Sequence, residues 1–385
     1  MLAKWTMSAK WSAALLSLAV LAPCAARAQP PIPPEEISVE KAIKPGPNVF
    51  VTNGAWDGAG AIYVFSADDL TYKGDYSTGM QPQFALSPDA NTGVVASAFP
   101  KRIMYGPVEA IVQKFDVATL KTQQEATILP KFAQISPQQG QIQVSADGMR
   151  AFVQNATPAT SVTVVDLKSG KVTAEAPIPG CWQINLSPDA GRFSSLCGDG
   201  TLLTVKIAAD GKVAGQAHSK PIFDVEKDPL FAQSQRVDGD LVFVSYSGVF
   251  YRVSDKGDAA ELIDTYAFAK DIEGDWAPGG YAVMGFSAPY GVMFVLMHPD
   301  AKDGSHKDAS QEIWAVDLAH KAVLYRSAAK GLTQVAVSQG KVPLVFGVAN
   351  HGGGLFRFEV DPTARFAAKL THQIALRDAA AVTVR

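Results

Sequence analysis

The stretch GCWQINLSPDAGRFSSLCGDG, residues 180–200, contains the pattern that decides the fold. An alternating run follows Cys181, the turn residues Ser187-Pro188-Asp189 come next, and a second short run leads to Cys197. Alternation with a period of two residues is typical of a half-buried β-strand, and Ser, Pro, Asp and Gly favour a tight turn. The stretch therefore predicts a β-hairpin with a cysteine at the outer end of each strand.

The two cysteines of this hairpin predict a disulfide bond. A tight turn brings the far ends of two antiparallel strands together, so a bridge between Cys181 and Cys197 is geometrically reasonable. The alternative is a pair of buried thiols. We favour the bridge because the N-terminal segment predicts export to an oxidising compartment.

That N-terminal segment, residues 1–28, has the organisation of a secretory signal peptide. Lys4 and Lys10 precede an apolar core over residues 13–22, and Ala26-Arg27-Ala28 matches an A-x-A cleavage site. The core is too short to span a bilayer as a helix, so no membrane insertion is expected. Cys24 is removed with the peptide; lipidation at Cys24 is the alternative, which the neighbouring proline disfavours.

The chain after residue 28 divides into two parts. Residues 29–47 begin with a proline-rich, acidic run and predict an extended N-terminal arm. Residues 48–385 are long enough to bury a sizeable core. The formal net charge of −3 provides no basic surface for nucleic acid.

A strand that ends in a polar turn recurs along residues 48–385. One copy is VTVVDLKSGK, residues 162–171, and the seven copies begin at residues 62, 112, 162, 202, 249, 313 and 355. A second motif, a strand followed by Ser and an Asp-containing turn, recurs at residues 84–89, 142–148, 184–189 and, degenerate, 335–340. Repeats of about 40–50 residues with several short strands each are typical of β-propeller blades. The sequence therefore predicts an all-β, seven-bladed β-propeller; a sandwich or two barrels would not repeat at this period.

The longer intervals between repeats predict loops on this scaffold. We expect them at Lys101–Val108, at Tyr266–Gly280 with a helical turn over Phe268–Glu273, and at Pro299–Ser310. The aspartates at the strand ends are interpreted as acceptors of turn amides, not as catalytic groups. Loops on a rigid scaffold are where function is expected.

The sequence contains no recognisable catalytic motif. It lacks a P-loop, a nucleotide-binding glycine pattern after a strand, HExxH and a nucleophile elbow. His298 and His306 share one loop with Asp300, Asp303 and Asp308, which allows a metal site, although a solvated charged loop is the favoured interpretation. By itself the sequence thus describes a secreted propeller with no evident catalytic set.

Several ordered motifs resemble the heavy (large) subunit of the quinoprotein amine dehydrogenases, and the aromatic amine dehydrogenase branch more than methylamine dehydrogenase. They run from the third to the sixth repeat and comprise Gln154–Ser161, Gly180–Trp182, Cys197–Gly200, Asp210–Ala214, Trp276–Tyr281, and Met297–Asp300 through Ser305–Lys307 to Glu312–Trp314. The first repeats match more loosely.

This resemblance implies a periplasmic assembly of two heavy plus two light subunits. The family's light subunit carries tryptophan tryptophylquinone, so no cofactor, no metal and no catalytic residue is expected on this chain. The assembly would deaminate primary, aromatic amines oxidatively to an aldehyde and ammonia, and pass electrons to a blue-copper protein of azurin or amicyanin type. This chain would be scaffold and substrate-channel wall.

The resemblance also implies one site residue. The family places a phenylalanine at the mouth of the substrate channel, and Met80 occupies the matching position here. The alternative is an ordinary loop or core methionine. The stretch Lys101–Pro107 also departs from the family, where the loop is more basic.

Two other functions remain open at this point. One is a stand-alone secreted propeller that binds or scaffolds without enzyme activity. The other is a propeller hydrolase such as a lactonase, which would need acidic ligands that converge on the central channel.

Overall fold

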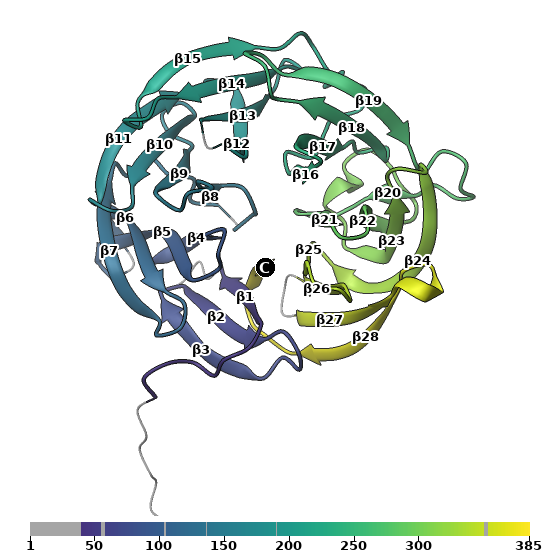
Figure 1. Ribbon diagram of the computed structural model, residues 1–385, viewed down its shortest axis with the longest axis horizontal. Coiled ribbons are helices and arrows are strands. Elements are labelled where there is room, and N and C mark those ends of the chain that lie inside the picture. Colours follow the sequence, from purple (N-terminus) through teal and green to yellow (C-terminus); the bar gives the residue numbers. More distant parts are fainter. Residues whose placement is uncertain (1–39, 55–57, 104, 136, 190, 350–352) are drawn as a thin grey trace, which may run out of the picture. The chain divides into compact units, whose positions relative to one another are not determined.

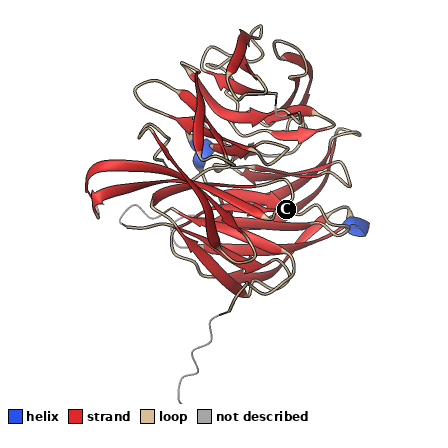
Figure 2. Cartoon of the chain, turned by 60° about the vertical axis from the view of Figure 1, so that its left-hand side comes forward, coloured by secondary structure: helices blue, strands red, loops and turns tan. Residues whose placement is uncertain are grey.

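Seven antiparallel sheets, called blades here, form a ring around a central axis (Figure 1). The computed structural model describes residues 40–54, 58–103, 105–135, 137–189, 191–349 and 353–385, so the predicted signal peptide lies outside the described residues. Strands make up nearly all the regular structure, with two short 3-10 helices at Ser305–Lys307 and Pro362–Ala364 (Figure 2). The predicted seven-bladed β-propeller is confirmed.

Each blade has its strands in order from the axis outward. Blades one to four are β29 (Ala379–Val384), β1 (Asn48–Asn53), β2 (Ala61–Ser66), β3 (Tyr72–Ser77); β4 (Met80–Leu86), β5 (Thr92–Arg102), β6 (Tyr105–Asp116), β7 (Lys121–Ile128); β8 (Ile142–Val144), β9 (Arg150–Asn155), β10 (Ser161–Asp166), β11 (Lys171–Pro177); and β12 (Cys181–Leu186), β13 (Arg192–Cys197), β14 (Leu202–Ile207), β15 (Val213–His218).

Blades five to seven follow the same order. They are β16 (Gln235–Val237), β17 (Asp240–Val244), β18 (Val249–Ser254), β19 (Glu261–Ala267); β20 (Ala277–Pro278) and β21 (Met284–Ser287), both beside β22 (Val292–His298), then β23 (Ser310–Asp317), β24 (Ala322–Leu332); and β25 (Gln334–Val337), β26 (Leu344–Ala349), β27 (Gly354–Asp361), β28 (Ala367–Ile374). None of the helices in the described part of the chain is long and apolar enough to cross a membrane.

The last strand closes the ring. β29 lies innermost in the first blade and pairs antiparallel with β1, with Val382 opposite Val51. The C-terminus accordingly lies near the centre of Figure 1. Because β29 supplies the inner strand of the first blade, the ring is closed. A closed ring has no terminal blade whose sheet would be exposed to solvent.

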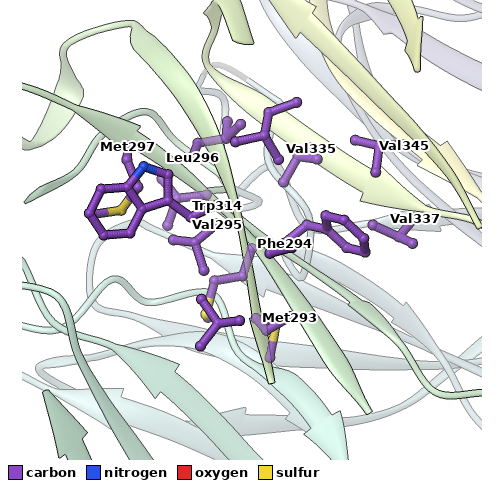
Figure 3. Packing of buried hydrophobic residues seen from close by; sticks show 14 of the residues in the cluster. Met293, Phe294, Val295, Leu296, Met297, Trp314, Val335, Val337 and Val345 are labelled. Carbon is purple, nitrogen blue, oxygen red and sulfur yellow. The ribbon is translucent and has the colours of Figure 1, made fainter. Parts of the chain in front are cut away.

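The blades stack through apolar faces on both sides. β22 is buried along its whole length, and Phe294 points toward Val335 and Val337 of the next blade, whereas Met297 lies beside Trp314 (Figure 3). A strand that is covered on both faces has a continuous run of apolar residues, as β22 does. The outermost strand β19 is instead largely exposed. Burial of these faces between neighbours stabilises the ring.

The two sequence motifs occupy equivalent places in the blades. The seven repeated turns join the third strand of a blade to its fourth, and the Ser–Asp turns join the first strand to the second. The strand-end aspartates accept turn amides as predicted: Asp116 Oδ1 accepts from the Thr119 amide at 2.7 Å, and Asp166 Oδ1 from the Ser169 amide at 2.6 Å. These aspartates are therefore structural.

Two of the predicted connections differ. Lys101–Val108 is not an open loop, because β5 and β6 continue as a hairpin with Pro100 opposite Val108 and Arg102 opposite Tyr105. The described residues at the tip of this hairpin are exposed, and only Phe99, Pro100 and Val108 near its base are partly buried, so its sequence lacks the alternation that indicates a strand. Over Phe268–Glu273 the helical turn is limited to one hydrogen bond, in which the Ile272 amide donates to the Ala269 carbonyl at 3.2 Å, and Phe268 is buried against Phe250 with ring centroids 4.4 Å apart.

Candidate functional site

One face of the ring carries the long connections. Because the strands of a blade alternate in direction, the connections between blades and those between second and third strands emerge on the same side, which we call the loop face. The turn before Met80, the β5–β6 hairpin and the loop over residues 299–309 all lie there. Function is expected at this face and at the central axis of the ring.

The central channel is lined by a set of buried glutamines. Each lies on or just before the innermost strand of its blade and is at least 95% buried; the set is Gln83, Gln141, Gln183, Gln233 and Gln334. The side-chain amides of all but Gln141 donate to backbone carbonyls. Gln334 Nε2, for example, donates to the Pro137 carbonyl at 2.9 Å. These amides supply hydrogen-bond donors to buried backbone carbonyls that the sheets do not pair.

Residues 133–135 and 137–141, which we call the plug, follow the second blade on the loop face and bond to residues around the axis. Gln83 Nε2 donates to the carbonyls of Ala133 and Ile135 at 3.3 and 3.2 Å. The Ile184 amide donates to Gly140 O at 3.1 Å from the fourth blade. The plug therefore bonds to several blades around the axis.

A central cavity of about 410 Å³ adjoins the plug. Amide, hydroxyl and guanidinium groups line it, and its described lining residues include no Asp, Glu or His side chain. Arg236, which does line it, is held by the buried Asp255 through bonds of 2.8 and 2.9 Å. The described lining thus offers neither an acid–base pair nor the acidic ligands that the lactonase hypothesis requires.

A second cavity of about 810 Å³ opens between the loops of blades five and six. Its floor contains the ring of His306, which stacks on Tyr246 with centroids 4.2 Å apart. Burial lowers the pKa of His306 and raises that of Tyr246. Both shifts favour the neutral form of the ring, which is the form that stacks here.

Among the described residues, the histidines of this region belong to no close group of three ligand-type side chains. His298 is buried; its Nδ1 donates to the Pro299 carbonyl at 2.8 Å, and its Nε2 faces the Ser305 hydroxyl at 3.4 Å. His306 turns instead to Tyr246. Within the described residues, the only close group of three ligand-type side chains is Cys197, Asp199 and His218, and Cys197 is already bonded to sulfur.

The predicted disulfide is present. Cys181 and Cys197 are directly opposite in the register of β12 and β13, both nearly fully buried, and their sulfurs are bonded. The bridge joins the loop-face ends of the two strands, close to the axis. It therefore fixes the inner part of the fourth blade.

Met80 begins β4 on the loop face. It is half-buried, lies opposite Ala98, and packs against the apolar cluster between blades two and three. The preceding Gly79 approaches β5 so closely that a Cβ there would lie 2.4 Å from the Ala98 carbonyl oxygen, which fixes the turn. Neither of the two cavities described above includes Met80.

The glutamines were missed by the sequence analysis, although a signal was present. In all four Ser–Asp motifs a glutamine stands four residues before the serine: Gln83 before Ser87, Gln141 before Ser145, Gln183 before Ser187 and Gln334 before Ser338. A buried amide at a fixed place in each repeat indicates a shared position on the axis.

Comparisons with known proteins give a family as well as a fold. The family model for the methylamine dehydrogenase heavy chain (MADH) matches residues 48–373. A methylamine dehydrogenase heavy chain from Methylorubrum extorquens is 29% identical over 210 residues, which cover 53% of this chain and 50% of that protein. The alignment thus spans half the length of that relative.

Solved propellers resemble the structure more broadly. The periplasmic gluconolactonase of Pseudomonas aeruginosa aligns with a TM-score of 0.62 at 16% identity, over 88% of this chain and 98% of that chain. A putative 6-phosphogluconolactonase from Bacteroides fragilis aligns with a TM-score of 0.61 at 10% identity, over 91% of this chain and 100% of that chain. At such low identities the likeness shows the fold alone.

Proposed function

Because the chain belongs to the methylamine dehydrogenase heavy chain family, we propose that it is the heavy subunit of a periplasmic amine dehydrogenase that oxidises primary, aromatic amines. The observation that carries this proposal is the family match, which extends over residues 48–373 and so includes strands of every blade. The structural likeness to lactonase propellers does not compete with it, because the described lining of the central cavity in this chain includes no Asp, Glu or His side chain.

We propose that the chemistry belongs to a light subunit. In that arrangement tryptophan tryptophylquinone of the light subunit accepts the electrons of the amine, and a blue-copper protein of azurin or amicyanin type receives them. Two heavy and two light subunits form the assembly. This chain supplies a rigid ring and a wall for the substrate channel, in which Met80 limits the space beside the amine.

The proposed location in the periplasm rests on two features. Residues 1–28 have the organisation of a signal peptide. The bond between Cys181 and Cys197 fits an oxidising compartment. The preference for aromatic amines rests on the motifs quoted above. The flexible Met80 in place of the family's phenylalanine leaves the specificity among amines open.

Co-expression with the light subunit and its maturation factors tests the proposal. The purified complex should show a quinone absorbance and dye-linked oxidation of phenylethylamine in preference to methylamine, while this chain alone should oxidise neither. Amine turnover by the isolated chain would contradict the division of labour. A chain that retains no light subunit would instead favour a stand-alone binding propeller.

A further inference from the structure

The β5–β6 hairpin continues beyond its own blade. Its last pair with β4 joins Ala98 to Met80, and its last pair with β7 joins Ala110 to Ile128. Residues 99–103 and 105–109, which we call the arm, therefore form a two-stranded ribbon with no strand on either side. An isolated two-stranded ribbon is only marginally stable in water, so the arm gains most if another surface covers it.

The arm exposes apolar side chains where a free ribbon would carry polar ones. Ile103 is 85% exposed and Tyr105 is 67% exposed. Exposed ribbons in soluble proteins are usually blunted by charges and prolines, and Pro100 and Pro107 fulfil that role here by removing edge amides. The prolines disfavour pairing with another strand, so the contact surface is the set of side chains near the tip.

The backbone at Ile103 is strained. Its φ of 66° lies in the left-handed region, which β-branched residues rarely adopt and which Gly or Asn would occupy at lower cost. A solvent-exposed turn has no packing reason to hold isoleucine in this conformation. Strain of this kind is typical of functional positions.

Position and charge identify the occupant. The arm rises from the pair Met80–Ala98, so a protein bound to it lies over the proposed channel mouth. Lys101 and Arg102 are exposed at the tip of a chain whose formal net charge is −3, and the Arg102 guanidinium lies over the Tyr105 ring at 5.4 Å. A cationic, aromatic tip fits an apolar patch edged by carboxylates.

We propose that the arm is a docking surface for the light subunit and holds it over Met80. Ile103 and Tyr105 insert into an apolar patch of the light subunit, and Lys101 and Arg102 pair with carboxylates at its rim. This inference rests on the proposed function, which supplies the light subunit as the partner. Burial of a tip isoleucine and tyrosine is the kind of contact that dominates interface stability.

The test uses the full exported chain and its light subunit. The double variant Ile103→Asp/Tyr105→Ser should weaken heavy–light association at least about tenfold, measured by titration and native mass spectrometry. Arg102→Glu should slow association and make its rate insensitive to salt, whereas the wild-type rate should fall as salt rises. The thermal midpoint of each variant should equal that of wild type, since neither change touches the core.

Val342→Asp is the matched control, because Val342 is similarly exposed at 58% but lies in the β25–β26 turn on the opposite face. It should leave association unchanged. Association of the arm variants within about twofold of wild type, or loss of association only between heavy chains, would overturn the proposal. If the wild-type chain does not bind the light subunit, the proposed function is wrong. If the wild-type chain and the arm variants bind it equally well, only the docking proposal is wrong.

Discussion

Gln233 Nε2 donates to Gln139 Oε1 at 2.8 Å in the middle of the ring. Gln139 Nε2 donates in turn to the carbonyls of Val335 and Val382 at 3.2 and 3.0 Å. One residue of the plug thus bonds to strands or adjoining segments of the fifth, seventh and first blades. The axis is held by amide hydrogen bonds between blades as well as by the apolar contacts farther out.

Removal of a buried axial amide should destabilise the whole ring. Gln334 is fully buried and donates to carbonyls of Pro137 in the plug and Ala380 in β29. Gln334→Ala leaves these carbonyls unpaired and should lower the free energy of unfolding by about 1–3 kcal/mol, measured by urea denaturation. The exposed Gln123→Ala is the control and should change it little; equal effects would mean that the axial bonds contribute nothing.

The Ser–Asp turns should make the free energy of unfolding depend on pH. The hydroxyls of Ser87, Ser145 and Ser187 donate to the neighbouring aspartates at 2.5 Å and hold the pKa values of those aspartates below the ordinary value. A lowered folded-state pKa contributes stability that is present above the unfolded pKa, near about 4, and is lost as the pH falls through the folded value.

The corresponding measurement compares the pH dependence of two proteins. The free energy of unfolding of the wild type should decline between about pH 5 and pH 3. The triple variant Ser87→Ala/Ser145→Ala/Ser187→Ala should decline less over the same interval, whatever its absolute stability. Identical slopes for the two proteins would refute the role assigned to the hydroxyls.

The disulfide should contribute measurably to stability. The bond between Cys181 and Cys197 closes a loop with a sequence separation of 16 residues. On the chain-entropy model its loss in Cys181→Ser/Cys197→Ser should cost about 3 kcal/mol. Thiol labelling of the denatured, unreduced exported protein should detect no free cysteine, and two labelled residues would disprove the bond.

The variant Met80→Ala distinguishes a channel residue from a core residue in one experiment. If it lines the substrate channel, Met80→Ala should change the ratio of kcat/KM for phenylethylamine and methylamine, with each methylene worth about 1–3 kcal/mol, and leave the thermal midpoint unchanged. If it is a core residue, the same variant should lose about 2–5 kcal/mol of stability with no change in the ratio. The complex with the light subunit is the protein to assay.

Local patterns determined much of this protein without reference to its structure. The seven repeated turns predict seven blades, and the Cys181–Cys197 hairpin predicts the bond, because a strand, a turn and the pairing of adjacent strands depend on residues close in the chain. The strand-end aspartates follow for the same reason. Family motifs in the same order along the chain pointed to the heavy subunit.

Only the tertiary structure shows the hydrogen bonds at the axis and the extension of the arm. Gln139 accepts a hydrogen bond from Gln233, 94 residues later, only because ring closure brings the inner strands of different blades around a common axis. The arm exists because β5 and β6 extend farther on the loop face than β4 and β7 do. No residue pattern marks this difference of strand length, because the tip of the ribbon is exposed. Contacts between distant residues depend on the closed ring, and local periodicity carries no information about them.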